Sequence, residues 1–160
     1  MISLIVASLL CALVAGIVLC FEIVVMPGTS VLDDRDFLRA FQVMDRVIQN
    51  NHPVFMLVWV GSVIAVVATL ALGFGQLNGI ELYLLLTAIL LYLLGVQFPT
   101  VRFNIPLNNR LQSLSLDDLS ASKLALARSE SASSWNRWNR FRTLISCVSA
   151  VTFLLLLYRL

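Results

Sequence analysis

The sequence predicts an all-α membrane protein, built as an antiparallel four-transmembrane-helix bundle with amphipathic helices in its two long connections. The chain of 160 residues is 59% hydrophobic and only 12% charged, and its mean hydropathy is +0.91. It contains four apolar runs, at about residues 2–25, 54–74, 80–103 and 141–158. Each run reaches or nearly reaches the ~20 residues needed to cross a bilayer core of ~30 Å. Backbone groups in lipid must bond within their own segment, so these runs should be helices.

The first run predicts a retained transmembrane helix rather than a signal peptide. No positively charged segment precedes it, and it is longer than the apolar core of a signal peptide. We expect this helix to end at Met26-Pro27-Gly28, because proline and glycine together stop a helix. The four spans and the two polar segments use the whole length, so one domain over residues 1–160 is expected.

The segment after the first run predicts an amphipathic helix over residues 34–50. Asp33 or Asp34 is a suitable N-cap. Four apolar residues recur at helical spacing and form one stripe, namely Phe37, Phe41, Met44 and Ile48. The segment Asn50-Asn51-His52-Pro53 then breaks the chain before the second run. Such a helix suits either the membrane surface or a position folded back over the mouth of the bundle.

The second and third runs predict an antiparallel helix pair, because only the short turn at residues 73–79 joins them. The third run is rich in leucine. Gly95, Gln97 and Pro99 are expected to interrupt it near its end.

The second long connection is expected to contain helix as well. Ser115 and Asp118 resemble a capping box, and residues 117–130 are rich in good helix formers. The serine-rich stretch 129–134 predicts a soft break. A new helix should then begin at Trp135 and continue into the fourth run.

The basic residues predict which side of the membrane each connection occupies. Ten of the eleven Lys and Arg residues lie in or beside the two long connections, and only Arg159 lies at the other side. The ten are Arg35, Arg39, Arg46, Arg102, Arg110, Lys123, Arg128, Arg137, Arg140 and Arg142. By the positive-inside rule, both long loops are cytoplasmic and the N- and C-termini are outside. A bacterial inner membrane is the expected location.

Polar side chains gather at one end of all four runs, where their burial is costly. They are Glu22, His52, Gln97, Arg102, Asn104, Asn108, Asn139 and Arg142. Trp135, Asn139 and Arg142 are spaced i, i+4 and i+7, so they share one helix face. We expect Arg142 or Arg102 to be the charge partner of Glu22. A purely structural interpretation stays open, because interhelical hydrogen bonds and an interfacial aromatic belt use the same residue types.

The composition argues against several classes of function. A net charge of +2 and the lack of a Lys/Arg-rich block argue against nucleic-acid binding. A single histidine is too few for the usual zinc or copper sites. No P-loop, HExxH or Ser-His-Asp pattern is present. The sequence therefore predicts no metal site and no cofactor, and any catalysis would rely on one base and a few hydrogen-bond donors.

Four short motifs occur in order along the chain. They are Val24-Val25-Met26-Pro27, Asn50-Asn51-His52-Pro53, Asn104-Ile105-Pro106-Leu107-Asn108 and Trp135-x-x-Trp138-Asn139-x-x-Arg142-Thr143. Together they resemble the DUF1772 family, which is also called anthrone oxygenase-like. The resemblance covers nearly the whole chain and implies a four-helix integral membrane protein. For the fungal members it implies oxidation of a polyketide anthrone to an anthraquinone with molecular oxygen, without a classical cofactor.

The first functional hypothesis is a membrane oxidoreductase acting on a hydrophobic phenolic or polycyclic substrate. An anthrone is acidic at its benzylic carbon, so a base and an oxyanion stabiliser suffice to start its reaction with oxygen. His52 or Glu22 would be the base, and Arg142 would stabilise the enolate oxygen.

The remaining polar residues of this end form the expected substrate-binding set. They are Asn104, Asn108, Asn139, Gln97 and Trp135, of which Trp135 would stack on the ring system. Asn108 and Asn139 would also help to stabilise the enolate oxygen.

The second hypothesis is a non-enzymatic membrane module that binds a lipid or another small molecule, or a small subunit of a larger membrane complex. The lone histidine and the absence of cofactor motifs favour it. Membrane lipids are expected partners under either hypothesis, and association of the chain with copies of itself stays open. A channel or transporter ranks third, because no inverted repeat is visible.

Overall fold

A computed structural model describes residues 1–160 and contains helices but no strands. Four continuous helical segments are long and apolar enough to cross a membrane. They are Ile2–Thr29, Pro53–Gly73, Gly79–Gln112 and Ala121–Arg159. The predicted fold class is therefore confirmed: the chain is an all-α membrane protein with four spans.

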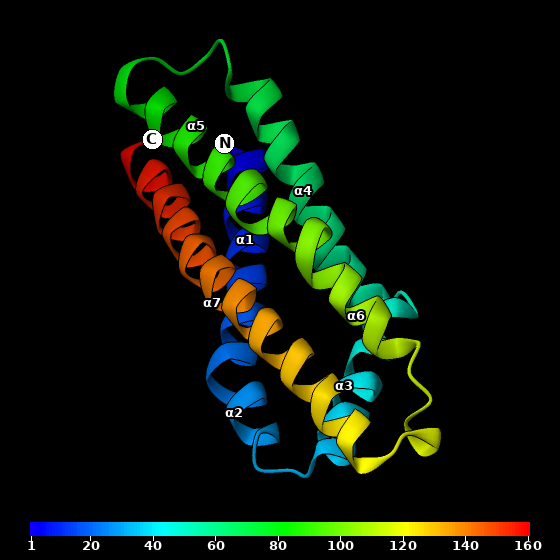
Figure 1. The fold of residues 1–160 in the computed structure, drawn as a ribbon. Coiled ribbons are helices and arrows are strands. Elements are labelled where there is room, and N and C mark those ends of the chain that lie inside the picture. Colours follow the sequence, from blue (N-terminus) through cyan, green and yellow to red (C-terminus); the bar gives the residue numbers. More distant parts are fainter.

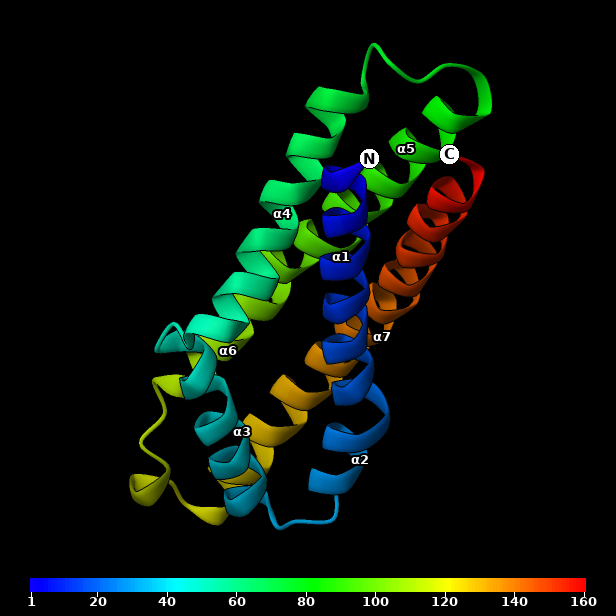
Figure 2. The same ribbon diagram turned by 180° about the vertical axis from the view of Figure 1, so that it is seen from behind.

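The four segments alternate in direction (Figures 1 and 2). The first contains α1 (Ile2–Cys20) and the third begins with α5 (Gly79–Tyr92); α4 (Pro53–Gly73) and α7 (Ala121–Arg159) run the opposite way. Both termini lie at one end of the bundle, and the two long connections lie at the other, which we name the connection end. α1 packs against α4 and α7, and α5 packs against α7, whereas α4 touches α5 much less.

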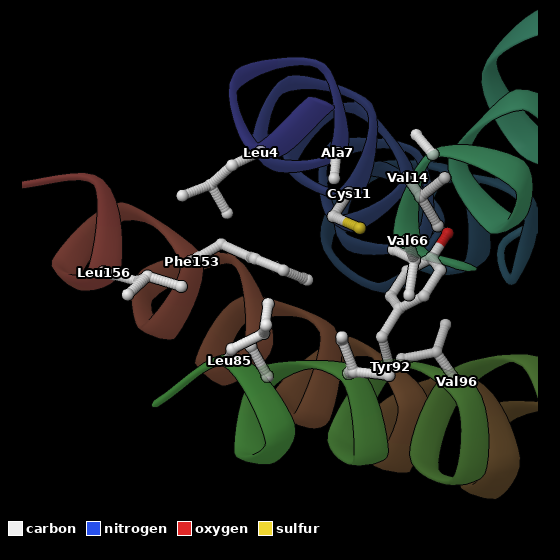
Figure 3. Close-up of a cluster of buried hydrophobic side chains, with 13 residues drawn as sticks. Leu4, Ala7, Cys11, Val14, Val66, Leu85, Tyr92, Val96, Phe153 and Leu156 are labelled. Atoms are coloured by element: carbon white, nitrogen blue, oxygen red, sulfur yellow. The ribbon is translucent and has the colours of Figure 1, made fainter. Parts of the chain in front are cut away.

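A hydrophobic core fills the half of the bundle nearer the termini (Figure 3). Leu4, Ala7, Cys11 and Val14 recur at helical spacing and turn one face of α1 inward, where Phe153 of α7 meets them. The opposite faces of the spans carry exposed leucine, isoleucine and valine side chains. This pattern suits a bundle whose outer surface contacts lipid.

The first long connection contains the predicted amphipathic helix, α3 (Asp34–Gln49). Asp33 caps it, since its carboxylate accepts a hydrogen bond from the Asp36 N–H at 2.8 Å. α3 folds back against α7 and against α6 (Ile105–Gln112), and so covers the connection end of the bundle. The chain then turns at Asn51, which has a left-handed φ of 56°.

Hydrogen bonds and ion pairs hold α3 in this position. The side-chain amide of Gln42 donates to the carbonyl oxygens of Leu111 and Leu114 at 2.7 and 3.0 Å. Arg35 and Arg39 both pair with Asp117 in the second connection. The covering helix is therefore anchored to α6 and to the second connection itself.

The first span ends at Thr29, one residue past the stop predicted at Met26-Pro27-Gly28, and Pro27 itself lies within the helix. A π-helical turn, η1 (Phe21–Val25), leads into the short helix α2 (Met26–Thr29), which contains Pro27 near its start. In the wider turn the Met26 N–H donates to the Phe21 carbonyl, five residues back. Such adjustments supply partners to the backbone groups that proline would leave unpaired, so the helix continues.

The third span follows the same rule. Two π-helical turns, η2 (Leu93–Gln97) and η3 (Thr100–Asn104), flank Pro99 and connect α5 to α6. The helix therefore continues through the expected interruption and extends to Gln112, beyond the predicted boundary near residue 103.

The second long connection is shorter than predicted. Ser115 precedes a single 3-10 turn, η4 (Leu116–Asp118), and its hydroxyl donates to the Asp118 carboxylate at 2.6 Å. α7 begins at Ala121 and runs without a break to Arg159. The expected soft break at residues 129–134 was wrong, because Ser129 and Ser133 bond to carbonyls of the preceding turn and Ser131 is buried.

Candidate functional site

A cavity of about 290 Å³ lies within the bundle near the connection end. It is lined by 17 residues, of which 12 are hydrophobic, from every spanning segment and from α3. They are Ile17, Val18, Phe21, Phe41, Met44, Asp45, Ile48, Phe55, Met56, Trp59, Val60, Thr100, Asn104, Ile105, Asn108, Trp135 and Arg142. Ligand sites typically have volumes of ~300–1,000 Å³, apolar walls and a few polar groups. The cavity has these properties and suits a small, mostly apolar ligand.

Arg142 is the one cationic residue in the lining. Its side chain extends from α7 and the residue is only 6% exposed. Its guanidinium donates to Asn139 Oδ1 at 3.0 and 3.3 Å and to Thr100 Oγ1 at 3.1 Å. It forms no ion pair with any carboxylate. A buried charge without a counter-charge is costly, and an anionic ligand would offset that cost.

Asn139 connects this guanidinium to Glu22. Its amide donates to Glu22 Oε2 at 3.1 Å and to the Val18 carbonyl at 3.2 Å, while its own oxygen accepts from Arg142. Glu22 pairs directly with Arg140, at 2.9 Å, and not with Arg142 or Arg102 as expected. Neither Glu22 nor Asn139 lines the cavity. Their contacts fix the position of Arg142 from behind.

Asp45 of α3 is the only carboxylate in the lining. It is buried and accepts hydrogen bonds from three side-chain amides. The donors are Asn108 and Gln49, both at 2.7 Å, and Gln112 at 3.0 Å. Asn108 in turn accepts a hydrogen bond from the Trp135 indole at 3.0 Å. One end of the cavity wall is therefore a carboxylate held rigidly by amides.

Asn104 lines the cavity and is 1% exposed. In the third span it lies between Thr100, which bonds to Arg142, and Asn108, which bonds to Asp45. Neither its side-chain oxygen nor its nitrogen has a hydrogen-bond partner. Buried polar groups in proteins are nearly always paired. An unpaired amide in a cavity wall therefore indicates a place where a bound molecule supplies the missing partners.

Aromatic side chains form much of the apolar wall. Phe55 and Trp59 of α4 are stacked, with ring centroids 5.3 Å apart. Trp135 lies opposite Phe41 in an edge-to-face contact at 5.5 Å, and the Arg142 guanidinium carbon is 5.4 Å from its ring centroid. Because Arg142 already covers one face of Trp135, the Phe55–Trp59 pair is the better placed surface for a ligand ring.

Besides Glu22 and Asn139, two more residues expected at the site lie outside the cavity lining. His52 is exposed, precedes α4, and is not part of the cavity lining. Gln97 also lies outside the lining, where it accepts from the Trp59 indole at 3.1 Å and donates to the Tyr92 hydroxyl at 2.8 Å. Gln97 therefore supports the aromatic wall from behind instead of facing the cavity.

Asp45 was missed by the sequence analysis, although a signal for it exists. It lies four residues after Phe41 and three before Ile48, and so falls on the apolar stripe of α3 rather than on its polar face. A carboxylate on a buried stripe needs hydrogen-bond partners, which indicates a built polar site. No three His, Cys, Asp or Glu side chains come together in the structure. The polar groups of the cavity are thus a carboxylate, amides, a hydroxyl and a guanidinium.

Comparisons with known proteins identify the family. No curated protein and no solved structure matches the chain. The family model described as anthrone oxygenase matches residues 44–152, which is more than half of the chain. The matched range includes Asp45, Asn104, Asn108, Trp135 and Arg142 of the cavity wall. The chain therefore belongs to the anthrone oxygenase family, as its ordered motifs indicated.

Proposed function

We propose that the protein oxidises a hydrophobic phenolic or polycyclic ketone with molecular oxygen, using the cavity near the connection end as its active site. The observation that carries this proposal is that a single apolar cavity contains one carboxylate, Asp45, and one guanidinium, Arg142, which has no ion-pair partner. Removal of a proton from carbon needs a base and a stabiliser for the resulting oxyanion. The family to which the chain belongs supplies the reaction class.

In this proposal Asp45 is the base, in place of His52 or Glu22. His52 lies outside the lining, and Glu22 is paired with Arg140. The Asp45 carboxylate would take a proton from the acidic CH₂ carbon of the substrate. Three of the five N–H groups of Arg142 already have partners, so two remain to bind the enolate oxygen. Asn104 would bind a further oxygen of the substrate.

The oxidation then balances with oxygen as the only co-reactant. The electron-rich enolate carbon transfers an electron to O₂, and the two radicals combine to form a C–O bond. The proton held by Asp45 converts the resulting peroxide anion to a hydroperoxide. Loss of the second C–H proton to Asp45 breaks the O–O bond and releases hydroxide, which recovers that proton as water. The net change is CH₂ + O₂ → C=O + H₂O.

We also propose that the connection end faces the cytoplasm. Ten of the eleven basic residues lie at or near this end, and Arg159 alone lies at the other. Under the positive-inside rule this distribution favours a cytoplasmic α3 and external termini.

The test is oxygen uptake by the protein in nanodiscs supplied with anthrones and hydroquinones. Asp45→Asn keeps the size of the side chain and should reduce turnover by ~10²–10⁴-fold, the usual contribution of a general base. His52→Ala serves as the matched control and should retain activity. Both variants should be compared for thermal unfolding, so that loss of fold is separated from loss of chemistry.

Each outcome points to a different conclusion. Full activity in a folded Asp45→Asn variant would refute the assignment of the base. Activity lost in His52→Ala but kept in Asp45→Asn would return the base to His52. Binding of an anthraquinone without any oxygen uptake above the spontaneous rate would instead support the module that binds a small molecule.

A further inference from the structure

We infer that the cavity opens sideways into the hydrocarbon of the bilayer, between α4 and the η3–α6 segment, and receives its ligand from the lipid. The inference rests on the cavity and not on the chemistry, although it also names the route by which the substrate of the proposed function would arrive. Among the 17 lining residues, the exposed ones are Val60 of α4, at 48%, and Ile105 of α6, at 43%. The wall therefore reaches the outer surface at these two positions.

The two helices that carry these residues are not packed together along this part of the bundle. α4 has its main contacts with α1, and its contacts with the third span are concentrated on α5. The side-chain bond from Trp59 to Gln97 is the link from α4 to the third span beside the cavity. Beyond it, towards the connection end, no direct hydrogen bond joins α4 to η3 or α6.

The surface around the opening is apolar. On α4, Leu57 and Ile64 lie about one turn before and after Val60, and both are exposed. On the third span, Phe98 and Val101 precede Ile105 at helical spacing and are exposed as well. Two exposed apolar stripes thus border the opening, and a bilayer is the environment that such stripes require.

The depth of the opening also fits the bilayer. α4 has 21 residues and is thus about 31 Å long, which matches a hydrocarbon core of ~30 Å. Val60 follows Pro53 by seven residues, a rise of about 10 Å from the start of α4. An opening at that depth faces acyl chains, not water.

The water-facing end of the cavity is closed by α3. Phe41, Met44 and Ile48 of α3 are part of the wall, and Gln42 fastens the helix to two backbone carbonyls. A ligand that entered from the water at the connection end would have to displace this helix. A ligand dissolved in lipid would meet only the side chains of Val60 and Ile105.

The test measures how fast 1,8-dihydroxyanthraquinone, which has no CH₂ group to oxidise, binds to the protein in nanodiscs, followed by quenching of tryptophan fluorescence. Val60→Phe and Ile105→Phe place larger side chains at the rim and so narrow the opening. Both should slow association and dissociation on the order of tenfold, within the ~1–3 decades of association rate seen among related variants. Because both residues also line the cavity, the decisive readout is the dissociation rate: a narrowed route lowers it, whereas a damaged binding surface raises it. Ile64→Phe and Val101→Phe add the same bulk outside the lining and should behave as wild type.

Two results would overturn the inference. One is an association rate that is unchanged in both rim variants. If Kd is weaker at that unchanged rate, these residues belong to the binding surface alone. The other is faster association in Gln42→Ala, which loosens α3 and would identify the water-facing end as the route. Since the probe is not oxidised, these results are independent of whether oxygen uptake is observed.

A second measurement needs no ligand and keeps the inference testable if the probe does not bind. A variant with Trp59→Phe and Trp138→Phe retains Trp135, a buried wall residue, as its only tryptophan. Lipids with brominated acyl chains should quench Trp135 more strongly than acrylamide in the water does. Stronger quenching by acrylamide would refute the sideways opening.

Discussion

Replacing Asn104 by leucine should make the ligand-free protein more stable. The two side chains have the same number of heavy atoms and the same branching, so the change mainly removes polarity. Asn104 is 1% exposed, and neither atom of its amide has a partner. A buried unpaired polar group costs ~1–3 kcal/mol. We therefore expect a gain of about 2 kcal/mol, which corresponds to a rise in Tm of ~4–8 °C for a chain of this size.

The same substitution at Asn139 should have the opposite effect and is the matched control. Asn139 is also fully buried, but its amide bonds to Glu22, to the Val18 carbonyl and to Arg142. Leucine there would leave the Arg142 guanidinium with Thr100 as its one hydrogen-bond partner. Removing a hydrogen-bond partner of a buried charged group costs at least ~1–3 kcal/mol. Two identical chemical changes in one helical bundle should thus differ in sign.

Unfolding in detergent micelles, followed by circular dichroism, measures both effects. A saturating ligand should then reverse the order of stability between wild type and Asn104→Leu. At a ligand concentration of 100 times the wild-type Kd, binding adds ~2.7 kcal/mol to the wild type. The order reverses when the variant gains less than ~0.7 kcal/mol, since the substitution itself adds about 2 kcal/mol. If Asn104→Leu is neutral or destabilising without ligand, the amide already has partners in the free protein and the reasoning fails.

Further predictions concern the packing of the bundle and the anchoring of α3. Gly95→Ala should destabilise the protein by ~1–3 kcal/mol, because a Cβ atom there would overlap the side chain of Ile145; the effect should shrink in the Ile145→Ala background. Gly16→Ala, which meets open space, should be neutral or stabilising by up to ~1 kcal/mol. Asp117→Ala breaks two ion pairs of α3, yet the carboxylate is 79% exposed, so a loss below ~1 kcal/mol is expected. The unfolding assay above checks all three, and a large loss in Asp117→Ala would show that α3 depends on these ion pairs.

The apolar runs sufficed to predict the four spans, since lipid imposes a length and a composition that are visible in any sequence. Local chemistry also predicted α3, through its Asp33 cap and its stripe from Phe37 to Ile48. The ends of the spans were predicted less well. Pro27 and Pro99 carry the same sequence signal whether a helix stops or continues, and only the neighbouring π-helical turns decide which occurs.

The site was harder to predict than the fold for a related reason. A π-helical turn holds about one residue more than an α-helical turn, which rotates the following helix by about 100°. Two such turns precede α6, so helical spacing counted from Gly79 does not indicate which side Asn108 faces. Topology nevertheless placed Asn104, Asn108 and Arg142 at one level, and helical spacing added Trp135; all four line the cavity. The presence of Asp45 in the lining and the absence of His52 from it depend on how α3 folds back. No local sequence pattern predicts that arrangement.

α7 follows all the other wall-forming segments of the cavity in the sequence, and this order affects how the protein is made. The other lining residues are all synthesised before residue 121, whereas Trp135 and Arg142 are synthesised with α7. This helix has the lowest hydropathy of the four spans. An arginine opposes membrane insertion by at most ~2.5–3.5 kcal/mol, the cost at the centre of a span, and by less near the end where Arg142 lies. The stable insertion of α7 is therefore expected to depend on polar groups of helices made earlier: Glu22, which pairs with Arg140, and Thr100, which accepts a hydrogen bond from Arg142. Co-translational assembly would then act as quality control, because only chains whose earlier helices are correctly placed accept the guanidinium into the bilayer.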